Sequence, residues 1–186
     1  SVLVQLGLDG LLQGKQVVHV SFDQHASYIM TWYEDIFSEI SKRKRLEQAE
    51  EVKDELVRKR VVLNFNQDTV STSQIVATLK ALSQGGIKAD YLIIDGLDFT
   101  KRSNADFEEV KNFAKENNIV VWYSCNSEGS ELKDIFDAER AKLFDSVILF
   151  ESKQDCTQLR ILKVREENIS DANLKLDPKT LLIAEK

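Results

Sequence analysis

Two aspartates follow short apolar runs in this chain, and their positions suggest metal-dependent phosphate chemistry. Asp95 closes the run Tyr91-Leu-Ile-Ile, and Asp23 comes directly after the run that ends at Phe22. A carboxylate at the carboxyl end of a buried strand can hold a magnesium-bound water, at the edge where open α/β sheets place their ligands. A second carboxylate beside it can polarise an attacking water as a general base. For Asp23, capping of a helix that begins near Ala26 is the alternative.

Three further polar residues follow later apolar runs and could contact a phosphate. Asn126 ends the sequence Tyr123-Ser-Cys-Asn, where its amide and the hydroxyl of Ser124 could sense a terminal phosphate; a hydrogen-bonded turn is the alternative. Lys163 and Arg165 stand two residues apart at the end of another expected strand, so their side chains should share one face. There a lysine point charge and an arginine fork could clamp a phosphate, although surface strand ends also carry such residues routinely.

The elements that must position these groups alternate between strands and helices. Five short runs, apolar on both faces, predict strands of the kind found at the centre of parallel sheets. They span residues 17–22, 61–65, 91–94, 119–123 and 147–150. Helical segments separate them, which indicates an α/β domain with a mostly parallel sheet and helices on both faces. Strands at 157–164 and 180–184 follow without helices between them, so we expect antiparallel additions at the C-terminal end of the sheet.

Helix start and stop signals are clear between the strands. Ser71 and Gln74 form a capping box ahead of an apolar stripe, which Gly85-Gly86 terminates. Residues 2–12 are almost all apolar apart from one narrow polar stripe, which predicts a nearly enclosed helix. Apolar residues at helical spacing predict a helix at 107–114 and another at 132–136.

A segment dominated by charges, residues 42–60, separates the first two expected strands. It offers few residues to bury, so we expect two helices, or one long bent helix, that project from the domain. Its composition fits a solvated helix face with many charge pairs. In the alternative, this segment is an arm for a protein partner, and the basic cluster at 42–45 contacts an acidic surface.

Composition limits the remaining function classes. With 186 residues, 42% hydrophobic and 30% charged, the chain predicts a single domain over residues 1–186. A net charge of −6 makes nucleic acid an unlikely partner and argues against an anionic membrane surface. Cys125 and Cys156 lack the spacing of a disulfide framework or a zinc site, and no apolar run approaches the roughly 20 residues of a membrane span. We therefore expect a cytoplasmic protein with two ordinary thiols.

Other chemistries find no support in the sequence. His19, inside an expected strand, and His25, near a helix start, have no third ligand at metal spacing, so we expect them to act as core or capping residues. Trp32 and Trp122 are expected to pack in the core. The chain contains no Gly-x-Ser-x-Gly elbow and no Gly-x-Gly-x-x-Gly fingerprint.

Taken in order, these segments resemble the core of RecA-like ATPases, and the KaiC branch most closely. The resemblance covers about residues 1–184. It includes an entry helix, Gly14-Lys-Gln before the first strand, the acidic tip at Asp23, the apolar run to Asp95, the polar tip at Ser124 and the sequence Lys163-Val-Arg. It implies a three-layer RecA-like domain that binds ATP and Mg²⁺.

The same resemblance assigns roles to individual residues. Asp95 takes the position of the Walker B acid, which holds the metal, and Asp23 that of the family's catalytic glutamate. Because Asp23 is one methylene shorter than glutamate, we expect weak or degenerate hydrolysis. Lys163 and Arg165 take the position of a finger that reaches the ATP of a neighbouring subunit, which implies self-association as a ring or filament.

The phosphate loop of that family, Gly-x-x-x-x-Gly-Lys-Ser/Thr, occurs nowhere in residues 1–186. In this fold the strand before the loop lies inside the sheet, and its loss would leave buried backbone groups unpaired at about 1–3 kcal/mol each. We therefore expect the loop upstream of Ser1. In the alternative, the protein is a non-enzymatic scaffold or regulatory module that kept the fold, lost the nucleotide and docks a protein partner.

Overall fold

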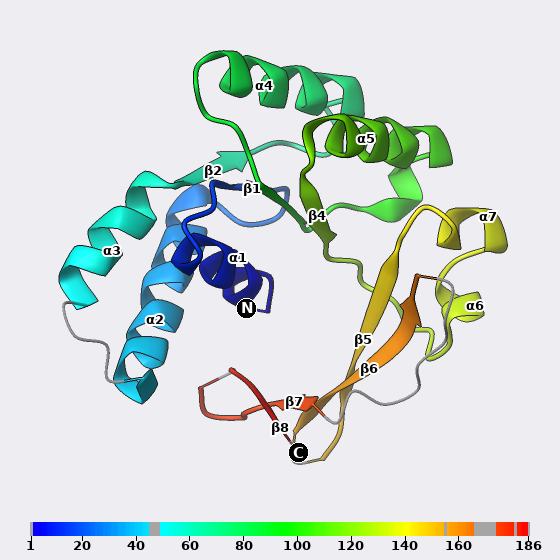
Figure 1. Ribbon diagram of the computed structural model, residues 1–186. Helices are drawn as coiled ribbons and strands as arrows, with labels where there is room; N and C mark the ends of the chain where they lie inside the picture. Colours follow the sequence, from blue (N-terminus) through cyan, green and yellow to red (C-terminus); the bar gives the residue numbers. More distant parts are fainter. Residues whose placement is uncertain (1, 45–48, 155, 166–173, 181, 186) are drawn as a thin grey trace. The chain divides into compact units, whose positions relative to one another are not determined.

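The computed structural model describes residues 2–44, 49–154, 156–165, 174–180 and 182–185 (Figure 1). The chain forms two compact units, Leu3–Cys125 and Asn126–Lys186. The first unit contains a parallel sheet and the second an antiparallel sheet, so the fold is of mixed α/β type, as expected. The expectation of a single domain over residues 1–186 stays a prediction. In the described ranges, no helix is both long enough and apolar enough to cross a membrane.

The first unit is built on a four-stranded parallel sheet. Its order is β2 (Arg60–Asn64), β1 (Val17–Ser21), β3 (Tyr91–Asp95) and β4 (Val120–Tyr123). β1 is buried along its whole length, whereas β2 and β4 are at most half-buried. The apolar runs at 61–65 and 119–123 were expected to be central strands, but they form the two edges of the sheet in the described part of the chain. A short run that is apolar on both faces therefore did not distinguish a central strand from an edge strand.

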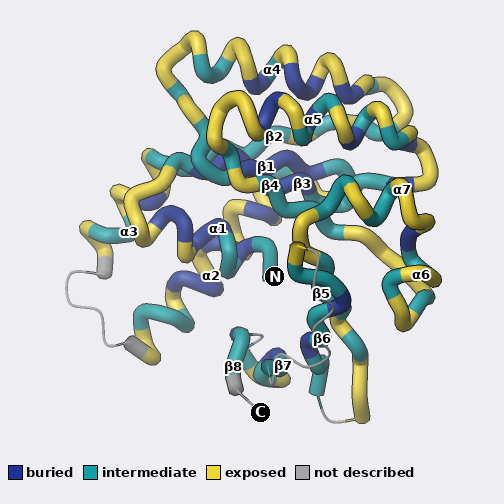
Figure 2. Tube along the Cα trace, turned by 45° about the vertical axis from the view of Figure 1, so that its right-hand side comes forward, coloured by how far each residue is buried: buried dark blue, intermediate teal, exposed yellow. Residues whose placement is uncertain are grey.

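Helices cover both faces of this sheet. Figures 1 and 2 show α4 (Thr72–Gln84) and α5 (Asn104–Asn117) side by side over one face, with α1 (Val2–Leu12) and α2 (Ala26–Lys44) under the other. The predicted capping box at Ser71 is confirmed, and Ser103 forms another at the start of α5. α1 approaches α2 closely because Gly7 has no side chain: a Cβ there would overlap the hydroxyl of Tyr33.

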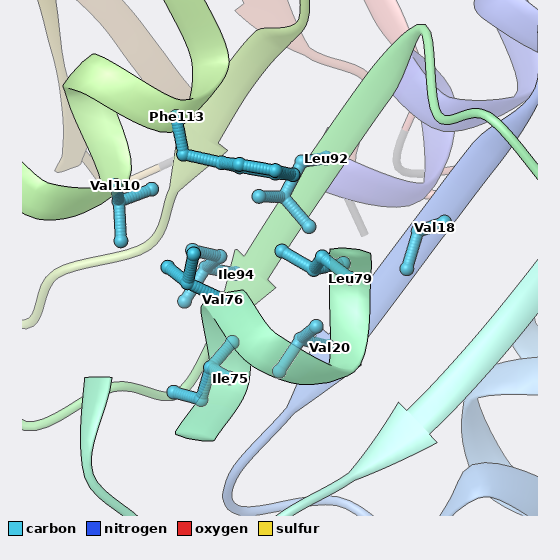
Figure 3. Close-up of a cluster of buried hydrophobic side chains, with 9 residues drawn as sticks. All are labelled: Val18, Val20, Ile75, Val76, Leu79, Leu92, Ile94, Val110 and Phe113. Carbon is cyan, nitrogen blue, oxygen red and sulfur yellow. The ribbon is translucent and has the colours of Figure 1, made fainter. Parts of the chain in front are cut away.

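Nine buried apolar side chains form a core between the sheet and the two helices α4 and α5 (Figure 3). β1 and β3 contribute alternate residues, because side chains two apart along a strand point to the same face. α4 and α5 contribute residues at helical spacing. The nine are Val18, Val20, Leu92 and Ile94 from the strands, and Ile75, Val76, Leu79, Val110 and Phe113 from the helices.

The charged segment forms two helices, one of the two arrangements expected from the sequence. α2 extends to Lys44, and α3 spans Ala49–Arg58. Residues 45–48 lie outside the described residues, and with them Arg45 of the basic cluster. The expectation that Trp32 packs in the core is wrong, because its side chain is 43% exposed on α2. Four residues before it, Tyr28 is also exposed, whereas Ile29 and Tyr33 are buried, so the apolar stripe is narrower than the aromatic residues suggest.

The second unit contains the antiparallel sheet. Its strands pair in the order β5 (Ser146–Ser152), β6 (Thr157–Val164), β7 (Leu174–Leu176) and β8 (Ile183–Glu185). The predicted antiparallel pairing is confirmed, but these strands form a sheet of their own. The prediction that residues 147–150 form a fifth parallel strand is wrong. Only four residues connect β5 to β6, which is long enough for a hairpin but too short for the crossover that parallel strands need.

Two short helices precede that sheet in the second unit. They are α6 (Leu132–Ile135), close to the prediction of 132–136, and α7 (Ala138–Ala141). The rings of Phe136 and Phe144 stack with their centroids 5.1 Å apart. On β6, the guanidinium of Arg160 pairs with the carboxylate of Glu151 on β5. β7 was not predicted, because its three residues are too few to show a period.

Replacing Leu92 should test the core directly. Its side chain is fully buried, so Leu92→Ala should lower the free energy of unfolding by about 2–5 kcal/mol. Leu12, at the end of α1, is 38% exposed, and Leu12→Ala is the matched control, with an expected loss of roughly 0.5 kcal/mol. Urea denaturation followed by the fluorescence of Trp32 and Trp122 measures both. Equal losses in the two variants would contradict the position of Leu92 in the core.

Candidate functional site

The structure places Asp23 and Asp95 beside each other at the carboxyl edge of the parallel sheet. β1 and β3 pair so that Ser21 stands opposite Asp95. The backbone amide of Phe22 then donates a 3.0 Å hydrogen bond to the carbonyl oxygen of Asp95. Just beyond, the carboxylate of Asp23 lies against Gly96: a Cβ on Gly96 would overlap it.

This edge is also where the order of the strands reverses. The chain leaves β1 for β2 on one side and then returns to β3 on the other side of β1. The loops after β1 and β3 therefore diverge, and in open α/β sheets ligands bind in the crevice between such loops. Gly96 has a φ of 73°, in the left-handed region. Because glycine has no Cβ, it adopts this conformation without strain, and the chain can turn immediately after Asp95.

A hydroxyl from the next strand holds the carboxylate of Asp95. Oγ of Ser124, directly after β4, donates a 2.5 Å hydrogen bond to Oδ1 of Asp95. Oγ of Ser124 also accepts a 2.8 Å hydrogen bond from the backbone amide of Gly96. Ser124 thus links the ends of β3 and β4 and orients the Asp95 carboxylate, a role that the sequence did not reveal.

A buried histidine approaches Asp95 from within β1. His19 is fully buried, and its Nε2 lies 3.8 Å from Oδ2 of Asp95, which is too long for a hydrogen bond. Its Nδ1 lies 3.2 Å from the hydroxyl oxygen of Tyr33. Nε2 of His19 has no hydrogen-bond partner in the described part of the chain. The expected core position of His19 is confirmed, but its proximity to Asp95 was missed. One signal in the sequence could have indicated this proximity, namely a histidine inside an otherwise apolar strand.

Burial and polar neighbours act in opposite directions on Asp95. Burial alone would raise the pKa of this carboxyl, because it disfavours the charged form. The approach of His19 and the hydrogen bond from Ser124 outweigh burial and lower the pKa of Asp95 below its ordinary value of 3.8. Asp95 is therefore a carboxylate at neutral pH. Burial also raises the pKa of Tyr33, so its hydroxyl keeps its proton.

Tyr33 and Arg60 support the buried side of this group. The ring of Tyr33 meets His19 edge to face, with the ring centroids 5.8 Å apart. The guanidinium of Arg60, the first residue of β2, lies 4.7 Å from the centroid of the Tyr33 ring, within the range of a cation–π interaction. Residues of β1, α2 and β2 thus fix the position of His19 beneath Asp95.

Asp23 remains on the solvent side of the site. Its side chain is exposed, and α2 begins only at Ala26. The residue directly before α2 is His25, whose Nδ1 lies 3.4 Å from the amide of Ser27. That contact fits the capping role expected for His25, and Asp23 lies two residues further from the helix.

The chemistry of this edge fits a hard divalent cation. The carboxylate of Asp95 is an oxygen ligand of the type that Mg²⁺ prefers, Ser124 orients it, and the carboxylate of Asp23 lies nearby, against Gly96. No group of three or more His, Cys, Asp and Glu residues able to hold a metal occurs among the residues that the structure describes. Proteins commonly bind Mg²⁺ through one or two carboxylates together with water and substrate phosphates.

The other three predicted site residues belong to the second unit. Asn126 is exposed. Nζ of Lys163 donates hydrogen bonds of 2.8 and 2.7 Å to the carbonyl oxygens of Ala141 and Phe144, at the end of α7. Arg165 is exposed and lies beyond β6 with a φ of 53°, so the argument that it shares a strand face with Lys163 does not apply. Nucleotide contacts by these residues stay a prediction.

Comparison with known proteins identifies no relative: no protein-family model matches the sequence, and neither does any curated protein. The resemblance to RecA-like and KaiC-like ATPases therefore depends on the residues and the order of segments given above.

The contact between Gly96 and Asp23 leads to a double-mutant test. Gly96→Ala should lower the free energy of unfolding for two reasons. Alanine in a left-handed conformation costs about 1–2 kcal/mol, and the added Cβ would displace the Asp23 carboxylate. Gly86→Ala is the matched control, because Gly86 also has a positive φ, of 93°, but no atom within 4 Å of the added Cβ. Urea denaturation should show the larger loss for Gly96→Ala.

The excess loss should disappear in an Asp23→Ala background, because that change removes the three carboxylate atoms nearest to Gly96. The cost of Gly96→Ala should then equal that of Gly86→Ala. An excess that persists without the Asp23 carboxylate would show that the two loops do not meet as described.

Proposed function

We propose that this protein is a RecA/KaiC-like ATP-binding domain, with its nucleotide phosphates near the carboxyl ends of β1 and β3. One observation carries this proposal: Asp23 and Asp95 converge where the strand order reverses. Phosphate ligands with Mg²⁺ need oxygen donors at such an edge. The resemblance of the segment order, described above, names the nucleotide as ATP.

In this proposal Asp95 is the metal-holding carboxylate. It carries a negative charge at neutral pH, because its pKa is lowered, and Ser124 fixes its orientation through the hydrogen bond to Oδ1. Mg²⁺, when bound together with ATP, would neutralise phosphate charge at this edge. His19 closes the buried side, so the free approach to Asp95 is from the loops after β1 and β3.

Asp23 is the candidate general base. Its carboxylate is exposed and lies next to Gly96, so it can accept a proton from a water at the same edge. Its side chain is one methylene shorter than that of the glutamate that the resemblance implies. A shorter reach favours weak hydrolysis, which suits a regulatory or signalling ATPase.

Self-association in a ring or filament belongs to the same proposal. Arg165 is exposed and can reach a neighbouring subunit, where a guanidinium fork suits a phosphate. For Lys163 to do the same, it must first release the carbonyl oxygens of Ala141 and Phe144. Arg165 is therefore the better candidate for a finger.

A second candidate function is a non-enzymatic module that docks a protein partner through the arm at 42–60. The observation that favours it is the exposure of large apolar side chains on α2 and α3, the two helices that contribute to this arm. They are Tyr28, Met30 and Trp32 on α2 and Val57 on α3. Val57 lies within the arm, and the other three lie before it on α2.

Calorimetric titration of the full-length protein with ATP, with and without Mg²⁺, separates the two candidates. We expect saturable, Mg²⁺-dependent binding. Ser124→Ala should weaken it about 10–100-fold, because the orienting partner of a ligating carboxylate is lost, and Asp95→Asn should remove the Mg²⁺ dependence. Asp54→Asn, an exposed aspartate on α3, is the matched control and should bind as the wild type does.

Two results would contradict the proposal. One is the absence of binding at millimolar ATP, which would favour the docking module. The other is binding that neither Mg²⁺ nor Asp95→Asn affects, which would place the nucleotide elsewhere. Circular dichroism of each variant should show native helix content, so that a loss of binding is not a loss of folding.

A further inference from the structure

A cavity of about 470 Å³ opens beside the Asp23–Asp95 edge, within the first unit. Its walls come from Phe22 after β1, from residues 64–68 at the end of β2 and from Lys101 in the short helix Phe99–Lys101 after β3. The volume falls in the range of small-ligand sites, about 300–1,000 Å³. Its position, outside the carboxyl ends of parallel strands, is the usual one for ligands in open α/β sheets.

Two phenylalanines give the cavity an aromatic wall. The rings of Phe22 and Phe65 lie 6.3 Å apart, centroid to centroid, with a tilt of 36°. Both are half-buried and pack against the nine-residue core from its margin. Each residue thus packs against the core and also lines the cavity. Half-buried aromatic rings of this kind are platforms on which a planar ligand can stack.

Three amide side chains line the same cavity. Gln67 uses both ends of its amide: its Nε2 donates to the carbonyl of Gly96 at 3.0 Å, and its Oε1 accepts from the amide of Asp98 at 2.6 Å. Gln67 therefore ties the loop after β2 to the loop after β3. This bridge makes the cavity wall continuous with the candidate phosphate site.

Asn64 and Asn66 supply the remaining acceptor and donor. Nδ2 of Asn64 donates to the carbonyl oxygens of Ser21 and Gln24, which leaves Oδ1 as an acceptor. Oδ1 of Asn66 accepts a 2.8 Å hydrogen bond from the amide of Asp68, which leaves Nδ2 as a donor. The bonded half orients each side chain, and both residues line the cavity.

The rim of the cavity has no net charge. Asp68 pairs with Lys101 at 2.7 Å, with both side chains largely exposed. Such exposed pairs contribute little to stability, so they can shift without cost to the fold. With charge balanced at the rim and neutral amides and aromatic rings on the walls, the cavity favours an uncharged planar group over an isolated anion or cation.

We propose that this cavity binds a nucleobase. A nucleobase is an uncharged ring that stacks on aromatic side chains and presents a donor next to an acceptor on its edge. Adenine presents the N7 acceptor beside the N6 donor on one edge, so adenine is the first base to test. The base can come from a free nucleoside or nucleotide, or from a single strand of nucleic acid, because the ring chemistry is the same.

The inference is independent of the proposed metal site, since adenosine has no phosphates. Adenosine should bind the full-length protein saturably by NMR titration, without Mg²⁺. Intermolecular nuclear Overhauser effects should connect the base protons to the rings of Phe22 and Phe65. Phe65→Ala should weaken binding about tenfold or more, the usual effect of removing a stacking ring, and Asn64→Leu should weaken it as well.

Asn112→Leu, on an exposed position of α5, is the matched control for Asn64→Leu and should bind as the wild type does. Asn64 is exposed, so Asn64→Leu keeps the proposal testable if Phe65→Ala unfolds. A single-stranded oligoadenylate is the second ligand. If the oligoadenylate binds more tightly than adenosine and salt weakens its binding, the source of the base is single-stranded nucleic acid. If the oligoadenylate binds equally or more weakly, the source is a free nucleoside or nucleotide. Both results support the proposal.

Absence of saturable adenosine, guanosine, cytidine and uridine binding overturns the inference, as does binding that Asn64→Leu and Asn112→Leu affect equally. Neither result bears on the Mg²⁺-dependent binding of ATP, which the titration with Asp95→Asn tests separately.

Discussion

The parallel pairing of β1 with β3 is the constraint on which the rest of the structure depends. It sets Ser21 opposite Asp95, so the two loops that carry the candidate acids start at the same level of the sheet. A shift of one residue would turn the side chains of β1 to the opposite faces. Val18 and Val20 would then leave the core, and His19 would no longer lie beneath Asp95. Core packing and site geometry therefore select the same register.

The polar residues beneath Asp95 are unusual for a strand so deeply buried. His19 brings an imidazole into a strand without solvent access, and its Nε2 keeps no hydrogen bond within the described residues. A buried polar atom without a partner costs about 1–3 kcal/mol, and a strand of valines alone would avoid this cost. Functional sites commonly depart from ideal packing in this way. The nine apolar residues on the other face of the sheet offset the cost through burial.

Much of the first unit could be predicted from sequence, because its signals are local. The capping box at Ser71 and the apolar runs at β1 and β3 each depend on residues close in the chain. The neighbourhood of Asp23 and Asp95 followed from the rule that the tips of parallel strands share an edge. The parts that were missed need contacts between distant residues: His19 beneath Asp95, Ser124 on its Oδ1, and the exposure of Trp32. For β5, the short connection to β6 was visible in the sequence and indicated a hairpin, but the prediction followed the apolar run at 147–150, which is typical of a parallel strand.

The central claim, that Asp95 holds a divalent cation at the sheet edge where Asp23 also lies, is tested most directly with Mn²⁺ as a paramagnetic substitute for Mg²⁺. In NMR spectra of the full-length protein with ATP, substoichiometric Mn²⁺ should broaden the amide resonances of Phe22, Asp23, Asp95, Gly96 and Ser124 together. Amides at the far ends of the same strands, such as those of Val17 and Tyr91, should stay sharper. Broadening that is uniform along β1 and β3, or that affects only one of the two loops, would contradict the account.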